Sequence, residues 1–469
     1  MSTEKRESRS LGLIIGAFTL VYLIGIGVIV LATAAWGGGG SGSGSGSGSD
    51  ESILNISLSE FAIKGDLNAT PGKITINITN DGSVAHDFQI ADLGILTDKI
   101  APGVSTTVVI EDAAAGSYEI ICTVAGHKES GMTATLTVGE SGGSASGGSS
   151  SHDHTSLTPE EAQARDDNMM AGMMSFGTDE AATEGRGNTP AEFTIAADGA
   201  KEFELTAAIT KWEVETGKFV DAWTYNGQVP GPWFKVDVGD RVRIKVTNNL
   251  PLGTDIHWHG IHLPNEMDGV APYTQDPIAP NGGTFTYEFT ADTRNNGMYH
   301  AHMHGEEAVP NGMLGVFQVG DVELPRGRTV SGINVPNDVN IVQEIPMVLN
   351  DAGAIGYSLN GKSFPSTEPV VVNKDDWFLV TYYNEGLQVH PMHMHGFPQL
   401  VVARDGITLD QPFWVDTITV GPGERYSILV KATDLGTWVW HCHILNHVET
   451  PERMFGMVTA VVVQDPAAA

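Results

Sequence analysis

Short stretches in which apolar and polar residues alternate, or in which β-branched residues dominate, recur along most of the chain. Residues 74–79 read Ile-Thr-Ile-Asn-Ile-Thr, and residues 106–110 read Thr-Thr-Val-Val-Ile. Turns rich in glycine, proline and asparagine separate these stretches. A period of two places successive side chains on opposite faces of a strand. The pattern therefore predicts an all-β chain, and its first unit, residues 51–140, is expected to be a β-sandwich.

A second pattern occurs twice in the rest of the chain. The motif Tyr-Asn-Gly-Gln-Val-Pro begins at Tyr225, and Leu-Asn-Gly-Lys-Ser-Phe-Pro begins at Leu359. A strand-like stretch follows each motif. Because both copies combine strand and turn signals, we expect two further sandwiches, at residues 189–322 and 340–465.

The N-terminal part has a different character. Lys5, Arg6 and Arg9 precede an uncharged apolar run over residues 11–36, which is long enough to cross a bilayer as a helix. The apolar region of a signal peptide usually has about 7–15 residues, so the run favours an anchor, although Ala32-Thr-Ala34 could be a cleavage site. We therefore expect residues 1–36 to form a cytoplasmic stub and a single-pass cell-membrane anchor, with the other domains on the extracytoplasmic side.

Composition identifies two linkers and narrows the choice of partners. Residues 37–50 are a Gly/Ser repeat, and residues 141–188 are rich in glycine, serine and acidic residues. The formal net charge of −32 argues against nucleic-acid partners and favours cationic ones. Two cysteines are too few for a disulfide framework.

Candidate metal chemistry is concentrated near the C-terminus. Residues 436–444, rich in Thr, Trp and Val, predict a strand that contains His441-Cys442-His443. In a strand the two histidines point to one face and the cysteine to the other. Cys442, with His447, a later methionine and a histidine from elsewhere, would form the His2Cys site with a weak axial Met that holds blue, electron-transferring copper. The flanking histidines would serve a different cluster on the opposite face.

The first sandwich contains a second set of this kind. Cys122, His127 and Met132 have the spacing Cys-x4-His-x4-Met, and His86 lies on another predicted strand. Thiolate, imidazole and thioether are the soft ligands that copper prefers. Residues 51–140 thus resemble a plastocyanin-type cupredoxin, and the resemblance implies a type 1 copper in an electron-transfer domain. Its implied ligands are His86, Cys122, His127 and Met132.

Four His-x-His pairs align between the two repeats, and with the last motif they resemble the multicopper oxidases, the laccase-like enzymes. The resemblance implies three cupredoxin-like Greek-key β-sandwiches after the transmembrane helix. It also implies that eight imidazoles hold a type 2 copper and a type 3 copper pair, at which O2 is reduced. These imidazoles belong to His257, His259, His300, His302, His393, His395, His441 and His443.

The resemblance places the other type 1 copper in the second repeat. Its implied equatorial ligands are His390, Cys442 and His447. The family usually places the axial methionine ten residues after the cysteine, where this chain has Glu452. The first repeat has Met313 thirteen residues after its His300, and equal spacing in the second repeat favours Met454 over Met457.

Two further expectations come from the same resemblance. Thr254, Ala301 and Glu306 occupy the aligned positions of the type 1 ligands in the first repeat, so only the second repeat is expected to keep this site. Asp268 matches a family acid near the three-copper cluster, and its implied role is to supply protons; the alternative is that it caps the turn before Gly269.

These motifs together predict about five coppers per chain and an enzyme that couples one-electron oxidation of a reducing substrate to reduction of O2 to water. Two-domain relatives assemble as homotrimers with clusters between subunits, and the resemblance implies the same here. The substrate stays open between a phenol, Fe2+, Cu+ and a small redox protein. The alternatives are a copper nitrite reductase and a membrane-tethered copper-binding electron shuttle without enzymatic activity.

Overall fold

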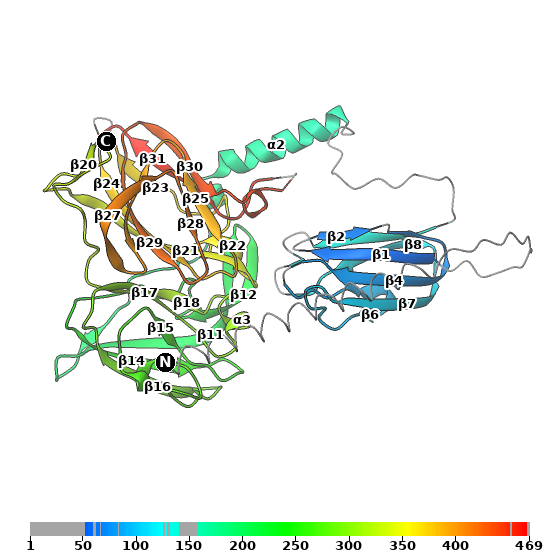
Figure 1. Cartoon of the computed structure of the whole chain (residues 1–469), viewed down its shortest axis with the longest axis horizontal. Helices are drawn as coiled ribbons and strands as arrows, with labels where there is room; N and C mark the ends of the chain where they lie inside the picture. The colour runs from blue at the N-terminus through cyan, green and yellow to red at the C-terminus, as the bar shows by residue number, and fades with distance from the viewer. Residues whose placement is uncertain are drawn as a thin grey trace, which may run out of the picture. The chain divides into compact units, whose positions relative to one another are not determined.

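A computed structural model describes residues 52–59, 62–65, 67–82, 84–124, 127–128, 132–139, 158–450 and 453–466 (Figure 1). Strands dominate this part of the chain, which confirms the all-β prediction. The predicted anchor at residues 1–36 and the linker at 37–50 lie outside the described residues. Within the described residues, no helix is long and apolar enough to cross a membrane.

The N-terminal sandwich, drawn in blue, has two sheets (Figure 1). One has the order β2-β1-β4-β7 and the other β3-β9-β8-β5-β6. The alternating stretch at residues 74–79 lies in β4, where Ile74, Ile76 and Ile78 are fully buried between the sheets. The strands are β1 (Ser52–Ser59), β2 (Ala62–Gly65), β3 (Asn68–Ala69), β4 (Gly72–Asn80), β5 (Gln89–Ile90), β6 (Ile95–Leu96), β7 (Ser105–Ala113), β8 (Gly116–Ile121) and β9 (Thr133–Val138).

Part of the segment expected to be a linker is helical. α2 (Pro159–Ser175) has little amphipathic character, and its Met170, Met173 and Met174 are exposed. Its C-terminal end joins the second repeat through Phe176, whose ring stacks on Phe364 with centroids 5.2 Å apart. Composition alone did not predict this helix, because the segment that contains it, residues 141–188, is rich in glycine, serine and acidic residues as a whole.

The first repeat is a sandwich whose sheets have the orders β10-β11-β14-β16, with β12 added beside β11, and β13-β18-β17-β15. Trp258 is buried at its centre, against Tyr287, Tyr299 and Phe317. The elements are β10 (Thr194–Ile195), β11 (Lys201–Glu215), β12 (Lys218–Tyr225), β13 (Phe234–Val236), β14 (Arg241–Asn248), β15 (His257–His259), β16 (Gly283–Thr290), β17 (Asn295–His300), α3 (Gly305–Ala308) and β18 (Leu314–Val319).

The second repeat has sheets of order β22-β21-β24-β29-β26-β27 and β23-β31-β30-β25-β28. A small pair, β19 (Thr329–Val330) and β20 (Ile333–Asn334), lies in the connection before it. The strands are β21 (Ile341–Ala352), β22 (Gly356–Leu359), β23 (Val370–Asn373), β24 (Trp377–Asn384), β25 (His390–Met394), β26 (Gln399–Arg404), β27 (Ile407–Val415), β28 (Thr417–Val420), β29 (Arg425–Lys431), β30 (Gly436–Cys442) and β31 (Val458–Gln464).

Buried polar contacts join the two repeats. The Trp212 indole donates to the carbonyl of Gly361 at 2.7 Å, and Lys362 donates to the carbonyl of Glu213 at 2.7 Å. The Lys362 ammonium also lies 3.9 Å from the centroid of the Trp212 ring. Such cation–π contacts are strongest when they are removed from water. On the other side of the interface, Arg425 of β29 donates to the carbonyl of Asn296 at 3.0 Å.

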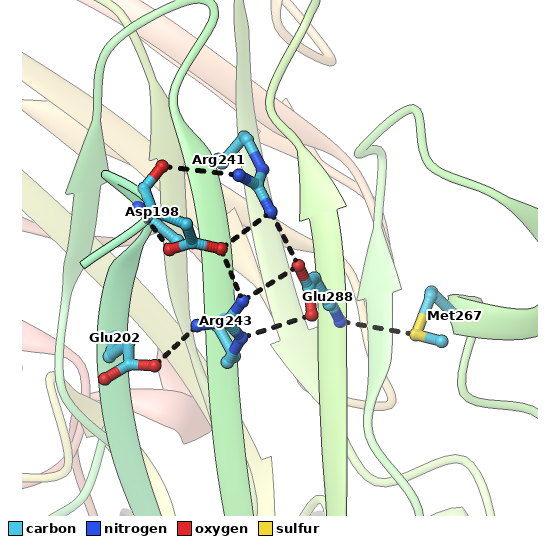
Figure 2. Close-up of polar contacts among 7 residues, drawn as sticks. Asp198, Glu202, Arg241, Arg243, Met267 and Glu288 are labelled. Atoms are coloured by element: carbon cyan, nitrogen blue, oxygen red, sulfur yellow. Dashed lines mark hydrogen bonds and ion pairs between the residues drawn. The ribbon is translucent and has the colours of Figure 1, made fainter. Parts of the chain in front are cut away.

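A network of ion pairs covers the outer face of the first repeat (Figure 2). Arg243 of β14 contacts Asp198, Glu202 and Glu288, and Arg241 contacts Asp198 and Glu288. A backbone hydrogen bond from Ala200, followed by the Arg243 guanidinium, lowers the pKa of Asp198 to about 2. These contacts bridge β11, β14 and β16, whereas the functional histidines lie on the other sheet.

Candidate metal centres

The C-terminal thiol site lies where β25 and β30 pair. Met392 is opposite Cys442, and His393 is opposite His441. The Cys442 sulfur lies 3.8 Å from Nδ1 of His390 and 3.6 Å from Nδ1 of His447. All three side chains are buried. One thiol and two ring nitrogens within 4.8 Å of one another are a donor set that suits copper.

Asp351 of β21 holds one of these ligands in position. Its carboxylate accepts a hydrogen bond from Nε2 of His390 at 2.8 Å and two more from the backbone amides of Leu387 and Gln388. A proton held on Nε2 leaves Nδ1 with its lone pair directed toward the thiol, as a metal ligand requires. On the other side, the Tyr357 ring stacks on His447 with centroids 4.2 Å apart.

Burial sets the protonation of this site. It raises the pKa of Cys442 to about 11 and lowers that of His447 to about 4. The thiol is therefore neutral at pH 7 until a cation replaces its proton, and the imidazole is already in its neutral, ligating form.

The N-terminal site has the same composition. The Cys122 sulfur lies 3.4 Å from Nδ1 of His127 and 3.9 Å from Nδ1 of His86, and all three side chains are buried. Asp87 follows His86 directly and accepts hydrogen bonds from the backbone amide and the hydroxyl of Thr123. These hydrogen bonds therefore connect the segment that carries His86 to the segment that carries Cys122, one residue away from each candidate ligand.

Backbone hydrogen bonds place one methionine next to each site. The Cys122 amide donates to the carbonyl of Met132 at 3.2 Å, and the Met132 amide donates to the carbonyl of His127 at 2.8 Å. In the second repeat the same two bonds run from Cys442 to Met457 and from Met457 to His447, each at 3.0 Å. Met457 is fully buried, whereas Met454 is only partly buried.

The structure therefore points to Met457 and away from the predicted Met454. In the first repeat, Ala301 donates to Met313 and Met313 donates to Ala308, so Met313 is the counterpart of Met457. By the same pattern Ala308, and not Glu306, occupies the position of His447. Equal spacing was misleading because the loops after Cys442 and Ala301 differ in length.

The eight remaining histidines form two groups of four. In the first repeat, His257 pairs with His300 across β15 and β17, and His259 and His302 complete the group. Their contacting rings have centroids 5.5–5.9 Å apart. Between His257 and His259 the side chain of Trp258 is buried, which confirms the alternation of faces. We call these four residues the first quartet.

The second quartet consists of His393, His395, His441 and His443. Its contacting rings have centroids 5.0–5.7 Å apart. Each of the eight imidazoles is half-buried or exposed. In the described part of the chain, ring contacts occur within each quartet but not between the two.

Burial keeps imidazoles of both quartets in the neutral form that can bind a metal ion. Burial lowers the pKa of His259 to about 3 and that of His300 to about 4. Burial also lowers the pKa values of His395 and His441 in the second quartet. These imidazoles are therefore neutral at pH 7, with a nitrogen available for a cation.

Carboxylates next to the first quartet orient its histidines. His257 donates through Nδ1 to the backbone carbonyl of Asp268 at 2.9 Å, and the Asp268 carboxylate lies 3.5 Å from the same nitrogen. Asp255, which is fully buried, accepts hydrogen bonds from the amides of His302 and Met303. Asp268 could be singled out from the sequence, whereas Asp255 and Asp351 could not, since carboxylates that act through a ligand have no motif of their own.

The first quartet lines a cavity of about 510 Å³. Residues 384–387 of the second repeat and Gly423 form part of its wall. The site therefore has room for a small molecule beside the imidazoles.

Two thiol-imidazole sites on β-sandwiches are typical of the cupredoxin class and are compatible with copper. Comparison with family models agrees: multicopper oxidase models match residues 206–323 and 334–466, and a cupredoxin-like domain model matches residues 63–138. The chain belongs to the multicopper oxidase family, whose members are oxidoreductases with type 1, type 2 and type 3 copper.

Individual relatives cover part of the chain. Laccase-2 of Botryotinia fuckeliana is 30% identical over 251 residues, which is 47% of this chain and 41% of the laccase. The solved multicopper oxidase mgLAC is 32% identical, with a TM-score of 0.51, and the match covers 56% of this chain and 86% of mgLAC. The blue copper oxidase from Nitrosomonas europaea is 31% identical, with a TM-score of 0.50 and coverage of 56% and 85%.

The assignment of Met457 predicts the effect of two conservative substitutions. In a Cys122→Ser background, which leaves the Cys442 site as the only thiolate site, Met457→Leu should change the visible absorption and the reduction potential, because the axial ligand tunes both. Met454→Leu serves as the matched control and should leave both unchanged. A spectrum that responds to Met454→Leu and not to Met457→Leu would restore Met454 as the ligand.

Proposed function

We propose that the chain is an O2-reducing multicopper oxidase, in which a reducing substrate is oxidised one electron at a time at the Cys442 site. The observation that carries this proposal is the placement of Cys442 between His441 and His443. Its thiol belongs to the buried site of the sandwich, and its two neighbours belong to the second quartet. Because consecutive residues of one strand connect the two sites, they are suited to the transfer of electrons from one to the other.

Each set of residues has a separate task in this proposal. His390, Cys442 and His447, with Met457 beside them, would hold a type 1 copper, and the two quartets would hold the type 2 copper and the type 3 pair. When bound, copper supplies one-electron redox chemistry. Four electrons and four protons convert one O2 to two water molecules, and Asp268, next to His257, is placed to take part in the proton transfers.

We further propose that the three-copper site forms between subunits of a homotrimer. The family's cluster needs eight imidazoles, and this chain presents them as two separate quartets on different repeats. Tyr273, close in sequence to Asp268, is 87% exposed, as an aromatic residue at an uncovered interface would be. The first quartet of one subunit would then meet the second quartet of the next.

The N-terminal cupredoxin domain is proposed as an electron entry port. Its site at Cys122 has the same donors as the Cys442 site, and the two are on one chain, so even a weak docking surface would bring them together often. The net charge of −32 favours a basic redox protein as the donor. The apolar run at residues 11–36 is proposed to anchor the assembly to the cell membrane.

Metal content and turnover test the central activity. Fully loaded protein should contain about five coppers per chain: one at each thiolate site and three shared between quartets. The same sample should consume O2 in the presence of a reducing substrate and should not convert nitrite to nitric oxide. Two coppers per chain with nitrite turnover would instead favour a nitrite reductase, and five coppers without turnover of either would favour an electron shuttle.

Removal of the Cys122 thiol tests the entry port. Cys122→Ser should abolish only the first blue site, so oxidation of a small donor that reaches the Cys442 site directly should continue nearly as before. Turnover with a basic protein donor should fall steeply. Cys442→Ser is the matched variant and should abolish turnover of both donors. If Cys122→Ser leaves both rates unchanged, the N-terminal domain has no electron-transfer role.

A further inference from the structure

A buried glutamate, Glu385, lines the cavity that contains the first quartet. Glu385 follows β24 directly, and only 6% of the residue is exposed. It lines the cavity of about 510 Å³ that also contains His257, His259, His300 and His302. The second repeat thus contributes an acid to the site built by the histidines of the first.

Among the described residues, Glu385 takes part in no ion pair. Arg425, the cation that opposes the effect of burial on Glu385, uses its guanidinium to donate to the carbonyls of Asn296, Gly423 and Asp405. One carboxyl oxygen of Glu385, Oε1, is buried without a hydrogen-bond partner in the described structure. A buried, unpartnered carboxylate is costly, so the group needs a proton or a ligand in the cavity.

The surroundings favour the protonated form. Burial raises the pKa of Glu385 well above its usual range, and the opposing effect of Arg425 is smaller. The other titratable groups around it are the phenols of Tyr225 and Tyr299, the four imidazoles and Glu306. Because burial raises its pKa, Glu385 favours the protonated form more strongly than an exposed carboxyl does. Glu306 lines the same cavity but is exposed.

The backbone holds Glu385 in a fixed position. Its amide donates to the carbonyl of Leu349 at 3.1 Å, and the next amide, that of Gly386, donates to the Asn384 side chain at 2.9 Å. The amides of Leu387 and Gln388 then donate to Asp351, the carboxylate that also holds His390. The segment at residues 384–388, in which Glu385 lines the cavity, is therefore fastened to the thiolate site.

We propose that Glu385 is a proton donor for the reduction of O2 in the first-quartet cavity. This inference rests on the proposed oxidase function. Electrons come from the reducing substrate through Cys442, and each turnover consumes four protons per O2. The Glu385 carboxyl gives one proton to oxygen as it is reduced in the cavity and becomes a carboxylate. Solvent water then returns a proton to it, so the acid is restored before the next transfer.

The test replaces Glu385 by glutamine, which keeps the shape but cannot give up a proton. After copper content has been matched, anaerobic reduction of the Cys442 site should proceed at the wild-type rate in Glu385→Gln. Reoxidation by O2 should slow by roughly 100-fold, the usual order for loss of a general acid. The solvent isotope effect on reoxidation should also change. Glu306→Gln, an exposed neighbour in the same cavity, is the matched control and should reoxidise like wild type.

Infrared spectroscopy gives a readout that does not depend on turnover. At neutral pH the copper-free protein should show the carbonyl band of a protonated carboxylic acid. This band should be absent from Glu385→Gln and present in Glu306→Gln. If Glu385→Gln does not fold, Glu385→Asp, which keeps a proton on a shorter side chain, should retain the band and reoxidise at an intermediate rate.

The outcomes separate this inference from the proposed function. Fully loaded wild-type protein that does not react with O2 would overturn the oxidase proposal and the proton role with it. Wild-type protein that consumes O2, with Glu385→Gln or Glu385→Asp reoxidising at the same rate, would overturn only the role of Glu385. So would an infrared band that persists in Glu385→Gln, because it would belong to another carboxyl.

Discussion

The alternation of side chains along β30 is the constraint on which the rest of the site depends. A strand cannot direct three successive side chains to one face. The sequence His441-Cys442-His443 therefore places a thiol in the buried interior of the second repeat and an imidazole on either side of it at the surface. Pairing of β30 with β25 adds His393 and His395 to the same surface. The interior and the surface thereby hold two different candidate metal sites, which consecutive residues of one strand connect.

The two repeats show how one scaffold can keep or lose the interior site. In the first repeat, Ala301, Ala308 and Met313 have the same backbone hydrogen-bond pattern as Cys442, His447 and Met457. Ala301, Ala308 and Met313 are all buried, so the interior is filled by apolar packing instead of metal ligands. The surface quartet survives in both repeats. The first repeat thus has the sandwich fold without the thiol site.

Much of this arrangement could be predicted from the sequence, because both the strands and the histidine pairs have a period of two. The fold class, the buried thiols and the grouping of the quartets follow from that local signal. Contacts between distant segments do not: Asp351 precedes His390 by 39 residues, and Glu385 reaches a cavity made by the other repeat. The backbone hydrogen bonds that favour Met457 over the predicted Met454 could not be read from residue spacing, because a loop of unequal length intervenes. Helix α2 escaped prediction because its composition resembles a linker.

Two quartets from different subunits are proposed to make one oxygen-reducing site, and subunit mixing tests this proposal most directly. One variant carries His257→Ala and His259→Ala, and the other carries His393→Ala and His395→Ala. Each alone should fail to reduce O2. Mixed oligomers, isolated with two different tags, should recover part of the activity, since an intact first quartet of one subunit meets an intact second quartet of its neighbour. Verified mixed oligomers without any O2 reduction would contradict the shared site.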